Sequence, residues 1–144
     1  MKALTLTQPW ATLVAIGAKS IETRSWFTSY RGELAIHAAK GWTRADRELC
    51  GQQPFFGPLI DQYPTLPAWD LAAALPRGAV IAIAFLSDCR IIRPGHYPGI
   101  TDQELAFGDY TPGRYRWYLT GVTPLNMPLP AKGSLGLWEW EVHL

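Results

Sequence analysis

The sequence predicts a small domain that is mostly β with α insertions, an α+β fold built as a β-barrel of five to six strands with two to four short helices. Three observations predict it. Segments of alternating polar and apolar residues, typical of strands, recur along the 144-residue chain. A uniformly apolar run at 79–86 has the length of a buried strand. Thirteen Gly and twelve Pro require many turns, and so leave room only for short helices.

The composition excludes several classes of protein. Thirteen basic and twelve acidic residues give a net charge of +1, which excludes a polybasic or acidic tail. Two cysteines exclude a disulfide framework, and three scattered histidines predict no metal site. The chain has no phosphate-binding glycine motif, so we expect no cofactor, and it has no apolar run long enough to span a membrane. We expect one cytoplasmic domain over residues 1–144, of unknown oligomeric state.

The N-terminal elements follow from local patterns. Residues 2–7 alternate and predict a strand. Thr7 can cap the helix that follows, and Pro9 suits its first turn because the missing N–H costs nothing there. Gly17 stands where a helix would end. Residues 20–26 alternate again and predict a second strand.

The middle of the chain predicts one strand and two helices. Residues 32–38 alternate, with an apolar face and an opposite, more polar face. Residues 43–50 predict a helix with Thr43 as its cap. Residues 52–67 are rich in proline, and we expect an irregular surface loop there. Residues 69–75 predict a short helix.

The C-terminal half contains the longest strand. Residues 78–92 predict this strand, and the uniform apolarity of 79–86 predicts burial on both faces at the centre of the sheet. Residues 101–107 predict a brief helix, and 115–122 and 135–142 predict the last two strands.

The densest polar cluster follows the first helix. Glu22 and Arg24 share one strand face, and Lys19 reaches that face from the preceding turn. Arginine forks onto oxygen atoms, and Trp10 and Trp26 could stack on a flat ligand, so the cluster would suit a planar anionic or amide group. The alternative is a plain ion pair at the surface.

Three further sites are open to two interpretations each. His37 is either a structural residue or part of a site. The segment 107–117 mixes aromatic residues with arginine, which fits base stacking and phosphate contact, or else a packed loop. Gly133 and Gly136 either let the backbone approach a base or form a hairpin. The first fifty residues hold seven basic and four acidic residues, so the N-terminal part of the chain is better suited to meet phosphate than the C-terminal part.

Several of these motifs together resemble the ASCH domain family, a branch of the PUA-like superfamily. The resemblance is carried by these segments: Leu6-Thr7-Gln8-Pro9-Trp10, Gly17-Ala18-Lys19-Ser20-Ile21-Glu22-Thr23-Arg24, Tyr30-Arg31-Gly32, Ile36-His37-Ala38, Phe107-Gly108-Asp109-Tyr110, Gly113-Arg114-Tyr115 and Gly136-Leu137-Trp138. It implies a PUA-like β-barrel with a cleft suited to RNA or a nucleobase.

The resemblance also implies a catalytic set to compare. One branch of the superfamily hydrolyses N4-acetylcytidine with a lysine, a threonine three residues later and a glutamate. Lys19 matches the lysine and Arg24 a nearby arginine, while Glu22 stands where the threonine would be. Asp109 lies in the region of the glutamate. A variant reaction would use Glu22 as general base on water, with Lys19 polarising the carbonyl.

Three hypotheses follow. The first is a domain that binds RNA, single-stranded nucleic acid or a nucleoside at the barrel mouth, with no membrane partner. The second is a metal-independent hydrolase, either a ribonuclease or an N4-acylcytidine amidohydrolase, that uses Lys19, Glu22 and Asp109. The third is a plain interaction domain. The residues expected to bind the ligand are Gln8, Trp10, Arg24, Trp26, His37, Tyr110, Arg114 and Tyr115.

Overall fold

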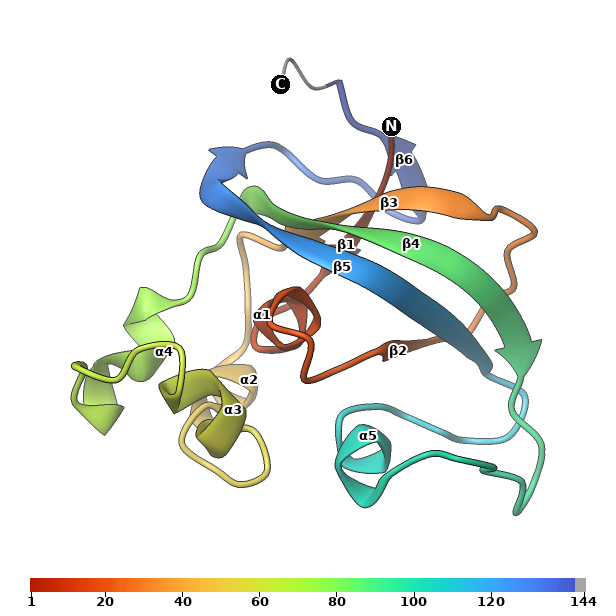
Figure 1. The fold of residues 1–144 in the computed structure, drawn as a ribbon, viewed down its shortest axis with the longest axis horizontal. Coiled ribbons are helices and arrows are strands. Elements are labelled where there is room, and N and C mark those ends of the chain that lie inside the picture. The colour runs from red at the N-terminus through yellow and green to blue at the C-terminus, as the bar shows by residue number, and fades with distance from the viewer. Residues whose placement is uncertain (142–144) are drawn as a thin grey trace.

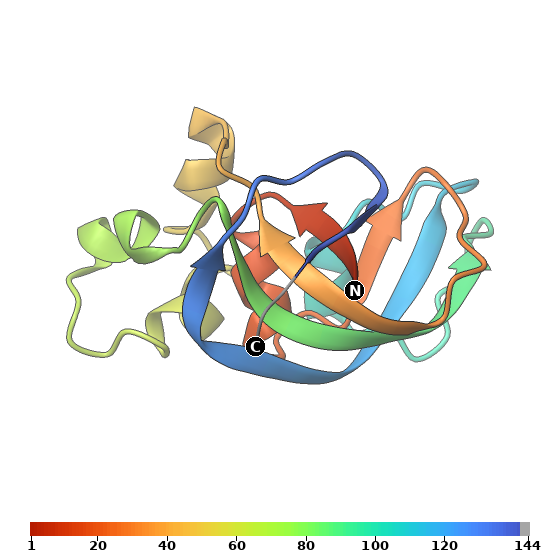
Figure 2. The ribbon, with the colours of Figure 1, turned by 90° about the horizontal axis from the view of Figure 1, so that it is seen from above.

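A curled six-stranded sheet is the main structural element of the protein, as a computed structural model that describes residues 1–141 shows (Figures 1 and 2). Its strand order is β2-β5-β4-β3-β1-β6, with β1 and β3 parallel and every other pair antiparallel. The sheet curls into a half-barrel, so the predicted fold, mostly β with α insertions, is confirmed. The strands are β1 (Lys2–Leu6), β2 (Ile21–Arg24), β3 (Gly32–Ala38), β4 (Ala79–Ile91), β5 (Tyr115–Pro130) and β6 (Leu137–Glu139).

Short helices surround the sheet. α1 packs on it through Ala11 and Val14, which join the main core. A second apolar cluster lies beyond α1, where Leu13 meets Phe55 and Phe107. Figure 1 shows α2, α3 and α4 grouped on one side of the molecule and α5 below β2. The helices are α1 (Trp10–Ala15), α2 (Arg44–Leu49), α3 (Phe56–Ile60), the 3-10 turn η1 (Ala68–Asp70), α4 (Leu71–Ala74) and α5 (Asp102–Ala106).

The cap expected at α1 is wrong. The helix begins after Pro9, and Thr7 makes no side-chain capping bond. Gln8 supplies the bond instead, because its Oε1 accepts the Thr12 N–H at 3.0 Å while its Nε2 donates to the Pro76 carbonyl at 2.7 Å. A buried amide therefore satisfies a donor that the first turn would leave without a partner. The cap expected at Thr43 is confirmed.

The surface loop expected at 52–67 is also wrong in part. This segment forms α3, and both Phe55 and Leu59 are buried. Side chains four residues apart lie on one face of a helix, so the two can enter the second cluster together. The prolines of this segment favoured a loop, so the sequence did not predict the short amphipathic helix.

Two strands end elsewhere than expected. β5 continues to Pro130 because its second half pairs with the start of β4, with register shifts along the pair. β6 is only three residues long, and part of the strand expected at 135–142 lies outside the described residues. Burial on both faces holds for the start of β4, whereas Phe85 and Ile91 further along are exposed.

Candidate functional site

A cleft opens where the two sides of the curled sheet approach each other. It lies between β1 and β2, which belong to opposite parts of the strand order. Its volume is about 450 Å³, within the range of small-molecule sites. The end of β1, the first residue of α1, β2 and the loop after α5 all contribute to it. Its lining residues are Thr5, Leu6, Thr7, Trp10, Glu22, Thr23, Arg24, Ala106, Phe107, Gly108, Asp109 and Arg114.

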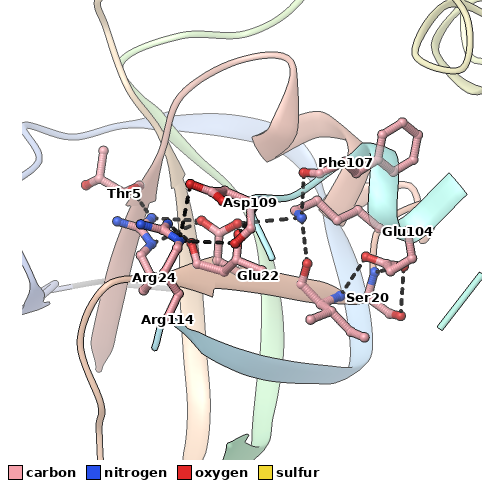
Figure 3. A network of polar contacts seen from close by, with 11 residues as sticks. Thr5, Ser20, Glu22, Arg24, Glu104, Phe107, Asp109 and Arg114 are labelled. Carbon is pink, nitrogen blue, oxygen red and sulfur yellow. Dashed lines mark hydrogen bonds and ion pairs between the residues drawn. The ribbon is translucent and has the colours of Figure 1, made fainter. Parts of the chain in front are cut away.

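Arg24 joins β2 to β1 across this cleft. Its Nη2 donates to the Thr5 carbonyl at 2.7 Å, and its Nε donates to Glu22 Oε2 at 3.1 Å (Figure 3). These bonds hold the guanidinium plane in place. The side chain keeps 24% of its surface exposed, so it remains accessible to a ligand in the cleft.

Lys19 lies behind Glu22 and does not line the cleft. Its side chain is fully buried, and its Nζ donates to the carbonyls of Ile21 at 2.5 Å and Phe107 at 3.0 Å. Glu22 Oε1 lies 3.6 Å from the same Nζ. Burial lowers the pKa of Lys19, and the Glu22 carboxylate opposes that shift. The ammonium thus donates two hydrogen bonds and forms one ion pair within the fold, and Lys19 holds Glu22 and the 107–109 loop together.

Arg114 and Asp109 lie beside Arg24 and Glu22 in the cleft. Arg114 Nε donates to the Asp109 carbonyl at 3.0 Å and lies 3.5 Å from its carboxylate, and Nη2 donates to the Thr23 carbonyl at 3.2 Å. Hydrogen bonds from Thr111 lower the pKa of Asp109, so this carboxyl is ionised at neutral pH. Figure 3 shows Arg24, Arg114, Glu22 and Asp109 gathered in one group.

The loop after α5 fits closely on β2. The Asp109 N–H donates to Thr23 Oγ1 at 3.0 Å. A Cβ on Gly108 would lie 3.1 Å from Thr23 and 2.9 Å from the Tyr110 ring, so the approach requires glycine. Nothing in the sequence pattern of the loop predicted this contact with β2.

Trp10 is the indole that lines the cleft. It is half-buried and stands edge-on against Phe55, with ring centroids 6.2 Å apart and planes at 88°. Phe55 in turn packs on Phe107. This packing fixes the Trp10 ring in the lining of the cleft, where a flat ligand would meet it.

Glu104 supports the site from behind, and the sequence pattern did not predict this position. It is buried, and its carboxylate accepts the N–H groups of Ser20 at 3.1 Å and Ile21 at 3.0 Å (Figure 3). The spacing Thr101-x-x-Glu104 is typical of a capping box, and Thr101 does cap α5. The glutamate, however, reaches across to the segment before β2 instead of back to its own helix, which the local pattern does not reveal.

Four other predicted ligand residues lie away from the cleft. Trp26 packs edge-on against Trp117 in the core, at 4.7 Å between ring centroids. Tyr115 packs on the same core, and Tyr110 is buried in a small cluster beneath β5. Gln8 is fully buried beside α1. The cleft therefore unites Trp10, Glu22, Arg24, Asp109 and Arg114 from the predicted set.

His37 lies in a second hollow that adjoins the first at Thr5. Its Nε2 faces the Ala131 carbonyl at 2.7 Å, so this nitrogen must donate. Nδ1 then accepts from Thr5 Oγ1 at 3.1 Å, and Thr5 accepts from Trp138 Nε1 at 3.0 Å. The face of β3 that the sequence suggested to be more polar is in fact covered, since His37 is 2% exposed. Every polar atom of the ring has a partner, as in a structural histidine.

The second hollow is larger and more basic. It has a volume of about 960 Å³, and Lys40, Arg77 and Lys132 line it together with the backbone of 130–135. A Cβ on Gly133 would come within 2.8 Å of both Thr5 and His37. The close approach of the 130–135 segment to β1 and β3 therefore depends on this glycine.

Within residues 1–141, His, Cys, Asp and Glu side chains nowhere gather in threes close enough to hold a metal ion. In the same part of the chain, no helix combines the length and the hydropathy that crossing a bilayer would need.

Two curated proteins are similar to this chain over part of their length. Activating signal cointegrator 1 of Mus musculus is 34% identical over 86 residues, which are 60% of this chain and 14% of that protein. The Homo sapiens protein of the same name is 51% identical over 35 residues, 24% of this chain and 6% of that protein. This chain therefore spans only a small part of the curated relatives it matches.

A solved structure and a family model complete the comparison. The crystal structure of a mutant form of the ZmASCH protein from Zymomonas mobilis is 16% identical, with a TM-score of 0.47, over 90% of this chain and 74% of that one. The model of the ASCH domain matches residues 4–126. Since that match covers most of the sequence, the chain belongs to the ASCH domain family.

Proposed function

We propose that the chain binds single-stranded nucleic acid, RNA in the first place, by holding a base or nucleotide in the cleft between β1 and β2. The observation that carries the proposal is the pair Arg24 and Arg114, held side by side at the end of β2 in a cleft that Trp10 also lines. The membership in the ASCH domain family supports it.

The cleft matches a flat heterocycle in its chemistry. The indole ring of Trp10 supplies a surface for stacking, which contributes about 1–3 kcal/mol per base. Glu22 and Asp109 present carboxylate oxygens that accept from exocyclic amino groups, and the Gly108 backbone lies beside them. The arginines retain donors for base oxygens or phosphate. Carboxylates and guanidinium groups together favour a base edge over a bare anion.

The second hollow extends the proposed surface. It meets the cleft at Thr5, and Lys40, Arg77 and Lys132 give it positive charge. A strand whose base occupies the cleft would have neighbouring phosphates in reach of these cations. Such contacts predict binding that weakens with salt.

The runner-up is the metal-independent hydrolase that acts on RNA or an acylated nucleoside. Glu22 lines the cleft and is the carboxylate that such a reaction would use as general base. Lys19, however, donates to two main-chain carbonyls and pairs with Glu22, and it does not line the cleft. We therefore place binding first. Hydrolysis of acetylated cytidine or RNA by the wild type, lost in Glu22→Gln, would reverse this order.

The test is fluorescence anisotropy with a short labelled single-stranded RNA and the matching DNA. Arg24→Ala should weaken binding about tenfold, because it removes a charge-assisted contact. Arg44→Ala is the matched control, since this substitution removes the same charge from the exposed surface of α2. Equal affinity of all three proteins would remove the cleft from the proposal.

A further inference from the structure

The guanidinium group of Arg116 on β5 is buried without adequate partners. The residue is 5% exposed, yet its Nε and Nη1 meet no hydrogen-bond acceptor within residues 1–141. Buried donors are nearly always paired, and a buried charged donor without an acceptor is costly. The arrangement therefore needs an explanation beyond folding.

A hollow of about 700 Å³ lies against Arg116. Its lining consists of Arg90, Ile91, Arg93, Pro94, His96 and Arg116. None of these side chains carries a negative charge. Beside the hollow, Asp88 accepts from Arg90 Nε at 2.6 Å and lies 3.7 Å from Arg31. One half-buried carboxylate is thus shared between two arginines, and it makes no ion pair with Arg93 or Arg116.

The sheet itself holds two of these cations together. Arg90 on β4 and Arg116 on β5 are direct partners in the strand register. Like charges directly opposite each other destabilise a sheet. The Tyr118 ring lies 5.9 Å from Arg116 Cζ and offers a cation–π contact. A ring face, however, provides no acceptor for the in-plane N–H groups of Nε and Nη1.

We propose that this hollow binds an oxyanion of the phosphate type, with Arg116 as the buried anchor and Arg90, Arg93 and His96 at its rim. The planar fork of arginine matches phosphate oxygens, and an anion in the hollow would compensate the guanidinium charge of Arg116. The hollow shares no lining residue with the cleft, so the site goes beyond the proposed function. The phosphate belongs either to a small ion or ester or to a nucleic-acid backbone.

The first experiment measures inorganic phosphate binding by the full chain, as the rise in melting temperature over chloride buffer of equal ionic strength. Arg93→Ala should weaken the apparent affinity about tenfold, and Arg116→Met should abolish the rise. Arg44→Ala, with the same loss of charge on α2, should behave like the wild type. In phosphate-free buffer, Arg116→Met should be at least as stable as the wild type, because it removes an unpaired buried charge.

Equal phosphate stabilisation of the wild type, Arg93→Ala and Arg116→Met would overturn the site. If Arg116→Met does not fold, Arg93→Ala alone decides. The second experiment repeats the comparison with labelled single-stranded RNA. A weaker affinity of Arg93→Ala, with a salt slope reduced by about one, identifies a backbone phosphate. Unchanged RNA affinity beside lost phosphate binding identifies a small phosphorylated ligand. Arg24→Ala in the same assay reports on the cleft separately.

Discussion

The Nη2 group of Arg24 donates a hydrogen bond to the main-chain oxygen of Thr5 at 2.7 Å. Arg24 ends β2 at one edge of the sheet, whereas Thr5 belongs to β1, with three strands between them in the strand order. The contact therefore crosses the open seam of the half-barrel and shows how far the sheet curls. The cleft lies at this seam, so one residue both closes the fold and lines the proposed binding site.

Replacement of Lys19 by methionine tests its structural role. The change leaves two buried carbonyls and the Glu22 carboxylate without their shared cation. We expect the free energy of unfolding to fall by about 3–5 kcal/mol, as when one partner of a buried pair is removed. Urea denaturation measures it. Lys132→Met, at an exposed position, is the control, and a loss no larger than that of the control would contradict the assigned role.

Replacement of Glu104 by glutamine tests the link between α5 and the start of β2. An amide has only one oxygen for the two N–H groups that the carboxylate now accepts, and it turns its own NH2 toward one of them. We expect a loss of about 1–3 kcal/mol and faster hydrogen exchange at Ser20 and Ile21. Asp102→Asn, on the exposed side of the same helix, should change neither quantity.

Replacement of Gly108 by alanine tests the close approach of the loop to β2. The new Cβ would lie 2.9 Å from the Tyr110 ring and 3.1 Å from Thr23. Since the neighbours must shift, we expect a loss of about 1–3 kcal/mol, measured by thermal unfolding. Gly41→Ala is the matched control, because a Cβ there meets no atom within 4 Å. Equal stability of the two variants would mean that the loop yields freely.

The pH dependence of stability tests the burial of Cys50. Burial raises the pKa of this thiol to about 11 from its usual 9.0. Above about pH 9 the unfolded chain releases the proton while the native protein keeps it, so this contribution to stability falls until about pH 11. Cys50→Ala should remove that part of the decline. Parallel pH profiles of wild type and variant, or rapid labelling of the native thiol, would contradict the burial of Cys50.

Much of the fold could be predicted because local patterns and packing agree. The alternation in β1 and β3 and the apolar run in β4 each place a strand correctly. The second half of β5 could not be predicted, since Pro124, Pro128 and Pro130 argue against a strand interior. Because β2 pairs only with residues 115–118, this half of β5 is an edge of the sheet, where proline is tolerated. α3 was missed because five residues are too short for a helical period to stand out.

The candidate site was predicted in its chemistry and only partly in its geometry. Glu22 and Arg24 do share a strand face, as period-two alternation requires. Sequence spacing says nothing about depth, so it could not show that Lys19 is buried behind Glu22. Nor could it bring Glu104 to Ser20 or Thr5 to Arg24, because those contacts depend on how the sheet curls.

Binding of nucleic acid in the cleft is tested by NMR mapping of a single-stranded RNA titrated into the labelled protein. We expect the indole N–H of Trp10, the amides of Gly108 and Asp109 and the Arg24 guanidinium to shift first, at the lowest RNA concentrations. Shifts confined to other surfaces, with these four signals unmoved at saturation, would contradict it.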